Sequence, residues 1–197
     1  YSDLLSIAED FIPEDLAKVY PTLPLNAHIT VHGNIDSICI DTLHLSMPTA
    51  IDIQAKGYVA DALVENGMKA HLLWDASTMN LDFIRRYLGY SDIHIPHMNL
   101  SADTKIQGNK YWADALLEQG KGTLHVKAHV NIDNMSYMAN MHAKEIDIRN
   151  FLPKDSIGLL TLSADISGHG TDPLSKATGV KAIVDLKHLE YKKWDVD

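Results

Sequence analysis

Apolar and polar residues alternate with a period of two through most of this chain, and this alternation constrains the fold more than any other feature. Successive side chains of a strand point to opposite faces, so the pattern predicts strands with one dry and one wet face. Four segments show it most clearly, with the apolar members Ala27, Ile29 and Val31; Ile51, Ile53, Ala55 and Val59; Leu124, Val126, Ala128, Val130 and Ile132; and Val180, Ala182, Val184 and Leu186.

Turn residues separate the alternating runs. They occur at Gly33-Asn34, at Asn66-Gly67, and in residues 120–122 and 170–173. Gly and Asn are favoured where a turn needs a positive φ, so each position indicates the end of a strand. The connections are short, and few segments have a helical pattern. The sequence therefore predicts a mainly β chain whose strands are mostly antiparallel.

Three segments align without gaps and indicate an internal repeat. They are residues 25–34, 100–109 and 162–171. Each reads Leu, then Asn or Ser, then Ala, then His or Asp, four further residues, Gly and a small polar residue. In the third segment Leu162, Ala164 and Ile166 alternate with polar residues. We interpret each as a strand closed by a Gly-containing turn.

A short helix is expected before each aligned segment. Pro13 and Pro21 mark the start and end of the first, and residues 149–153 hold the third. The second is the clearest, because Leu81, Ile84 and Leu88 share one helical face. Ser77, Thr78 or Asn80 could cap its start, and Gly89 could end it.

These features predict an elongated, curved antiparallel sheet, a trough or β-taco-like structure, with short helices between about three irregular repeats. The approximate repeats are 10–80, 81–147 and 148–197, within a single repeat-built segment covering 1–197. A compact sandwich would hide the dry faces of its sheets against each other, whereas a trough would leave its dry face available to a ligand. The sequence leaves both arrangements open.

Composition excludes several function classes. Apolar residues make up 46% of the chain and charged residues 22%, as in folded proteins. The net charge is −9, and the basic clusters, such as Lys192-Lys193, are only two residues long. A nucleic-acid partner needs larger clusters of Lys and Arg to neutralise its phosphates, so such a partner is not expected. The single cysteine, Cys39, cannot form an internal disulfide. The chain opens at Tyr1 and stops at Asp197 in mid-pattern, so we expect a segment of a longer protein.

One stretch resembles a known family. Residues 160–173, which include Gly170-Thr171-Asp172-Pro173, are followed by alternating residues 180–189 and then by Tyr191 and Trp194. This run resembles the Gly-Thr-Asp-Pro segments of the TamB/AsmA-like family of envelope proteins. Residues 15–57 are similar to a recurrent pattern of the family, in which a strand and a Gly are followed by a second strand, a short gap and a third strand that ends in Gly. Residues 61–99 match least well.

The resemblance implies a curved β trough lined by apolar side chains, in a periplasmic protein anchored in the inner membrane of a Gram-negative bacterium. It also implies a phospholipid or another apolar ligand, with an outer-membrane β-barrel protein as a partner. Membrane contact would be made through parts of the parent protein outside this chain. The candidate ligand-binding residues are those of the dry face: Ala27, Ile29, Val31, Leu124, Val126, Ala128, Val130, Ile132, Leu162, Ala164, Ile166, Val180, Ala182, Val184 and Leu186.

Catalytic and metal-binding patterns are weak. His28 and His32, like His125 and His129, are four residues apart, and four strand residues span about 13 Å, too far for two ligands of one zinc ion. We find no phosphate loop and no nucleophile elbow, and Cys39 lies within an apolar run that suits a structural thiol. We therefore expect no catalytic residue, no metal and no cofactor.

A second function stays open, in which the chain is a non-catalytic scaffold. It would recruit another protein through a sheet edge or through its apolar face. The residues Met135, Met138 and Met141 beside Tyr137 could line such an adaptable contact, although a core or a hairpin is the commoner use.

Overall fold

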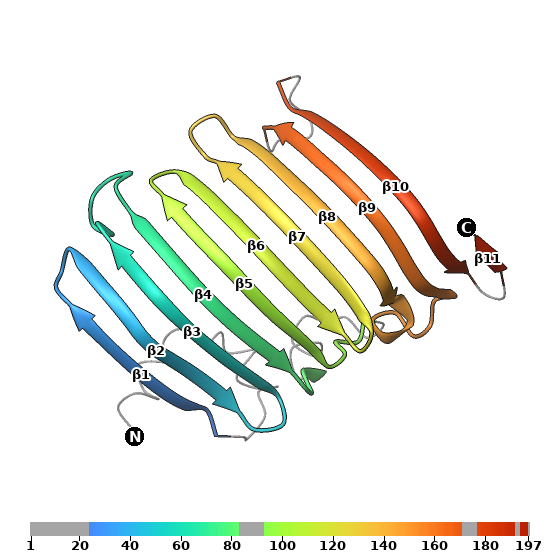
Figure 1. Cartoon of the computed structure of the whole chain (residues 1–197), viewed down its shortest axis with the longest axis horizontal. Coiled ribbons are helices and arrows are strands. Elements are labelled where there is room, and N and C mark those ends of the chain that lie inside the picture. Colours follow the sequence, from blue (N-terminus) through green and yellow to red (C-terminus); the bar gives the residue numbers. More distant parts are fainter. Residues whose placement is uncertain (1–23, 83–92, 171–176, 192–193, 197) are drawn as a thin grey trace.

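The computed structural model describes residues 24–82, 93–170, 177–191 and 194–196. They form one open sheet of eleven strands, in which each strand is antiparallel to the next strand along the chain (Figure 1). The prediction of a mainly β, antiparallel chain is confirmed. A sandwich needs a second sheet, and the described residues form only this one.

The strands follow one another with short connections, as the alternating pattern predicted. They are β1 (Asn26–Gly33), β2 (Ser37–Met47), β3 (Ile51–Ala60), β4 (Lys69–Thr78), β5 (Met98–Gln107), β6 (Lys110–Gln119), β7 (Gly122–Asn131), β8 (Ser136–Asp147), β9 (Ile157–His169), β10 (Gly179–Tyr191) and β11 (Trp194–Val196).

Bulges keep the apolar residues of a strand on one face where the alternation of the sequence breaks. Register shifts fall between Ile40 and Leu43 of β2, between Ala143 and Ile146 of β8, and between Leu186 and His188 of β10, and a further shift lies between Leu189 and Tyr191. An extra residue in one strand offsets the phase of its side chains by one position. Glu145 has the positive φ of 52° in the β8 bulge, and the next residue, Ile146, returns to the apolar side.

The aligned segments of the sequence fall on β1, β5 and β9, which are every fourth strand of the sheet. Their closing glycines have positive φ angles of 133° at Gly33, 57° at Gly108 and 75° at Gly170. After Gly33, the side-chain oxygen of Asn34 accepts hydrogen bonds from the backbone N–H groups of Asp36 and Ser37. Residues 171–173 of the Gly-Thr-Asp-Pro stretch lie outside the described residues.

Two longer connections lie where helices were expected. Residues 79–97 join β4 to β5, and residues 148–156 join β8 to β9. The two connections meet where the N–H of His94 donates to the carbonyl of Phe151 at 2.7 Å. The second connection contains only a short 3₁₀ helix, η1 (Ile148–Asn150).

The other two expected helices lie mostly outside the described residues. The undescribed parts are residues 10–21 of the first helix and residues 83–89 of the second. The expected start of the second can be examined. Ser77 and Thr78 are the last residues of β4, so the prediction that either caps a helix is wrong. Asn80 instead accepts a hydrogen bond from the N–H of Asp82 at 3.0 Å, as a capping side chain does.

The buried core of the described residues is small and lies at one end of β2 and β3. It consists of Met47, Ala50 and Leu81, with Ile51 and Ile95 packed against it. Leu81 and Ile95 belong to the connection between β4 and β5, so that connection covers one corner of the sheet.

An ion-pair cluster ties η1 to the sheet. The Asp147 carboxylate accepts hydrogen bonds from the Arg149 backbone N–H at 3.1 Å and from its Nε at 2.9 Å. Arg149 also donates to Glu190 of β10 at 3.4 Å, and Glu190 accepts the N–H of Leu159 at 3.1 Å. The Arg149 guanidinium holds the pKa of the Asp147 carboxyl below its ordinary value of 3.8.

This cluster predicts a pH dependence of stability. Because the pKa of Asp147 is lowered by folding, its contribution is present above pH 3.8 and is lost as the pH falls through the lower folded-state pKa. We expect Asp147→Asn to reduce the free energy of unfolding near pH 6, and the difference from wild type to shrink below about pH 4. Urea unfolding at a series of pH values measures this. Asp185→Asn, at a carboxylate 66% exposed, is the control and should cost little at any pH. A difference for Asp147→Asn that is independent of pH would contradict the prediction.

Candidate functional site

The strand registers place the predicted apolar residues on one side of the sheet. Residues directly opposite each other in an antiparallel pair have side chains on the same face. Leu124 of β7 lies opposite Ala143 of β8, which lies opposite Leu162 of β9, which lies opposite Leu186 of β10. The same reasoning links Ala27, Ile29 and Val31 on β1 to the apolar residues of β2.

We call this side the apolar face. All of the predicted candidates lie on it except Ile132, which follows the end of β7 in a turn. The structure therefore brings together residues that are far apart in the sequence.

Sequence reasoning missed more than half of this face. The additional members lie mostly on β2, β4, β5, β6 and β8, with one each on β9 and β10, and they are Ile38, Ile40, Leu43, Leu45, Ala70, Leu72, Trp74, Ala76, Leu100, Ala102, Ile106, Tyr111, Ala113, Ala115, Leu117, Tyr137, Ala139, Met141, Ala143, Ile146, Leu160 and Leu189. Alternation in β3 was recognised, and the same test applied to β4, β5 and β6 would have found others. The apolar face consequently extends without interruption from β1 to β10.

Exposure varies across the apolar face. At the two edges the side chains are open to solvent, with exposed fractions of 55% for Ile29, 65% for Val180 and 59% for Val184. In the middle, small residues lie low between larger ones. Ala164, for example, is only 6% exposed and lies directly opposite Met141 and Val184. Large exposed apolar areas on a soluble protein usually mark a binding surface.

A row in which most side chains are small crosses the apolar face at right angles to the strands. Its members lie opposite one another from β5 to β10 and are Thr104, Ala113, Ala128, Ala139, Ile166 and Ala182. We call this the alanine row. The row on one side of it includes Tyr111, Val130 and Tyr137, and the row on the other side combines Val126 and Met141 with Ala102, Ala115 and Ala164.

The opposite side, the polar face, is covered by cross-strand pairs of histidine and aspartate. His32 pairs with Asp41 at 2.8 Å, His44 with Asp52 at 2.7 Å, and His71 with Asp103 at 2.9 Å. His125 pairs in the same way with Asp114. Hydrogen bonds from His44 and His125 lower the pKa of the Asp52 and Asp114 carboxyls, respectively, below their ordinary values. These histidines thus have partners on neighbouring strands.

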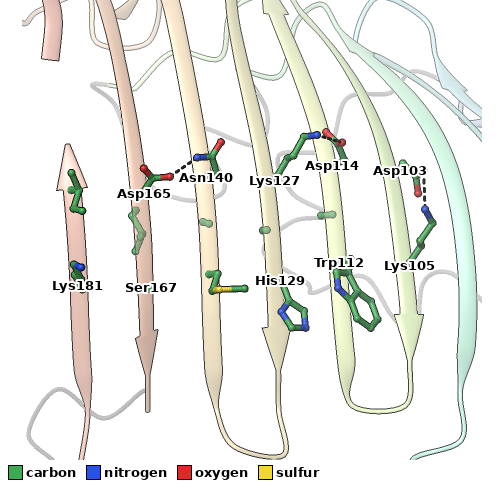
Figure 2. Close-up of a pocket in the computed structure, with 16 residues that line it drawn as sticks. Asp103, Lys105, Trp112, Asp114, Lys127, His129, Asn140, Asp165, Ser167 and Lys181 are labelled. Atoms are coloured by element: carbon green, nitrogen blue, oxygen red, sulfur yellow. Dashed lines mark hydrogen bonds and ion pairs between the residues drawn. The ribbon is translucent and has the colours of Figure 1, made fainter. Parts of the chain in front are cut away.

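The polar face also contains a hollow of about 630 Å³ that crosses six strands (Figure 2). Two rows of side chains border it, and within each row the residues lie opposite one another from β5 to β10. The first row is Lys105, Trp112, His129, Met138, Ser167 and Lys181. The second row is Asp103, Asp114, Lys127, Asn140, Asp165 and Ile183. We call this the polar hollow.

The floor of the polar hollow is formed by the strand segments that carry the alanine row on the other face. Ala113, Ala128 and Ala139 line it, although the registers place their side chains on the apolar face. No direct signal in the sequence indicates the hollow, because its residues are spread over six strands and follow no motif. The two faces of the same strands therefore offer two different surfaces.

Other kinds of site find little support in the described part of the chain. It contains no group of three or more His, Cys, Asp and Glu side chains placed to hold a metal ion. Cys39 is half-buried and lies opposite Tyr58 on the polar face. None of the described helices is long and apolar enough to cross a membrane.

Comparisons of the chain with models of protein families, with curated proteins and with solved structures found no match.

Proposed function

We propose that this chain carries lipid, and that its apolar face holds the acyl chains. The observation that supports this most directly is the continuity of the apolar face over ten consecutive strands, with aliphatic side chains open to solvent at both edges. An ordinary core residue would be covered by a second layer. Val180, Ile29 and Val184 are each more than half exposed, so they remain available to a ligand.

The alanine row is the place on this face that fits an acyl chain best. Four of its six side chains are alanine, and a hydrocarbon chain lying across the strands there would contact apolar atoms of this row and of the rows beside it. Each methylene removed from water contributes about 0.8 kcal/mol, so a long chain gains on the order of 10 kcal/mol relative to water. Relative to a bilayer the gain is close to zero. A carrier benefits from this balance because the lipid can leave as readily as it enters.

The resemblance of residues 160–173 to the TamB/AsmA-like family supports the same function. On this basis we propose a curved trough built from repeats of four strands, beginning at β1, β5 and β9. We further propose that the parent protein is periplasmic and anchored in the inner membrane of a Gram-negative bacterium. Its ligand would be phospholipid, and an outer-membrane β-barrel protein would receive or assist the cargo.

Organic extraction and mass spectrometry of gently purified protein test the lipid proposal. We expect phospholipid in the wild type and none in a protein carrying both Val130→Asp and Val184→Asp, which puts two charges on the apolar face. Photo-crosslinkers at the same two positions should capture lipid in cells. A folded, monomeric wild type without lipid in either assay would rule out this function.

A second candidate function is protein recruitment by strand addition, and the β1 edge favours it. Among the described residues β1 pairs with β2 alone, and all eight residues of β1 are exposed. Its sequence contains no Lys and no Pro, the residues that commonly protect an edge from pairing with another chain. An incoming strand would find unpaired backbone N–H and C=O groups there.

This candidate predicts self-association through β1. We expect the wild type to sediment as dimers or larger species, and we expect a protein with His28→Lys and Thr30→Lys to be monomeric, because charges on an edge oppose strand pairing. Both changes are on the polar face, so they leave the apolar face intact. Replacing Lys69 and Lys105 of inner strands with Arg is the control and should not alter the assembly. A monomeric wild type would exclude self-pairing through this edge.

A further inference from the structure

The polar hollow has the chemistry of a binding site, and it lies on the face that the lipid proposal does not use. Two of its three lysines already pair with carboxylates. Lys105 lies 3.4 Å from Asp103, and Lys127 lies 3.2 Å from Asp114. Asn140 donates a hydrogen bond to Asp165 (Figure 2). A charged ligand would have to displace these partners, whereas an uncharged polar ligand can add hydrogen bonds to their remaining donors and acceptors.

The hollow also contains an apolar patch. The rings of Trp112 and His129 stack with centroids 5.0 Å apart and planes within 10° of parallel. Beyond them, Met138 is 57% exposed and Ile183 is 56% exposed. Nε2 of His129 is covered and has no hydrogen-bond partner among the described residues. Aromatic and aliphatic surface with a few polar groups around it is the usual composition of a small-ligand site.

The shape of the hollow restricts the ligand further. It crosses six strands, and five spacings of about 4.8 Å give it a length of roughly 24 Å. It is partly open to solvent along this length. A long, narrow, uncharged molecule with many hydroxyl groups and one less polar face fits such a surface, and a short chain of sugar units has these properties.

We propose that the polar hollow binds an uncharged linear oligosaccharide. The less polar faces of the sugar rings pack on Trp112, Met138 and Ile183. Hydroxyl groups exchange hydrogen bonds with Asp165, Asn140 and the ammonium groups of the lysines. Lys181, which has no ion pair among the described residues, contributes a free donor at the β10 end of the hollow.

Titration of the full chain with maltotetraose, cellotetraose and chitotetraose tests this, with isothermal calorimetry and tryptophan fluorescence as readouts. We expect at least one of the three to bind with a Kd below about 1 mM. Trp112→Ala should weaken that binding by about tenfold, the effect of losing one aromatic contact. Tyr58→Ala is the matched control, because Tyr58 is a 42% exposed aromatic residue on β3, outside the hollow.

Two further variants keep the test decisive if Trp112→Ala fails to fold. Asn140→Ala and Ile183→Ser alter opposite chemical features of the hollow and are at exposed or half-exposed positions. Each should weaken binding of the same oligosaccharide. If the folded wild type binds none of the three probes, or if Tyr58→Ala weakens binding as much as the hollow variants do, the proposal is wrong. Lipid content plays no part in the measurement, so the two proposals stand or fall separately.

Discussion

Phospholipid should be lost from a Val184→Asp protein and retained by an Ile183→Asp protein, although the two substitutions are at adjacent residues. Val184 is 59% exposed on the apolar face and Ile183 is 56% exposed on the polar face, so each change puts the same charge at a similarly open position of β10. Only Val184 lies on the face that we propose for acyl chains, directly opposite Ala164 and two residues from Ala182 of the alanine row. A buried, unpaired carboxylate is costly, and it would exclude hydrocarbon from that part of the face.

Mass spectrometry of extracted lipid, normalised to protein, measures the difference. The expected ratio of phospholipid in Ile183→Asp to that in Val184→Asp is at least about tenfold, since a cost of 1.4 kcal/mol already gives that factor. Circular dichroism and sedimentation of both proteins establish that they are folded and equally dispersed. Equal lipid content in the two variants would mean that the apolar face is not the site of binding.

Gly57→Ala should be among the most destabilising single substitutions in this sheet. Gly57 lies within β3 with a φ of 149°, and a Cβ built there would be 1.9 Å from the backbone carbonyl oxygen of His71 on β4. Both the strained φ and the backbone overlap oppose a side chain, and neither can be relieved by turning a rotamer. We expect the free energy of unfolding to fall by about 3 kcal/mol.

Gly120→Ala is the matched control for this prediction. Gly120 also has a positive φ, of 60°, but it lies in the turn between β6 and β7, and a Cβ there has nothing within 4 Å. We expect this change to lower the free energy of unfolding by only about 1 kcal/mol, which is the effect of the backbone conformation alone. Urea denaturation of both variants gives the comparison. Equal losses of stability in the two variants would show that the close approach of the His71 backbone does not exclude a side chain at position 57.

Local pattern predicted the sheet well because each strand needs only its own alternation to define two faces. The run from Leu124 to Val130 illustrates this, since its residues alone assign β7 and its apolar side. The pattern also indicated the Gly-containing turns after β1, β5 and β9. The local pattern could not predict whether the structure has one layer of sheet or two. An alternating strand has the same sequence whether its dry face is covered by a second sheet or left open.

The places where prediction failed are those where distant residues decide the outcome. The bulges break the period of two, and only the partner strand shows that Ile146 and Leu189 rejoin the apolar face. The spacing of Met138 and Met141 indicated a shared contact, yet the registers place Met138 on the polar face and Met141 on the apolar face. The polar hollow depends on six strands in register, and no single segment carries its signal.

The strictly sequential strand order has a consequence for how such a molecule grows and comes apart. Each strand pairs only with the strands that precede and follow it in the sequence, so the sheet has low contact order. During folding, each hairpin can therefore add to the one before it. Stability is then a sum of neighbouring interfaces, as in a linear repeat protein. Opening begins at the ends and moves inward, and the sheet can be lengthened by whole hairpins while both faces keep their character.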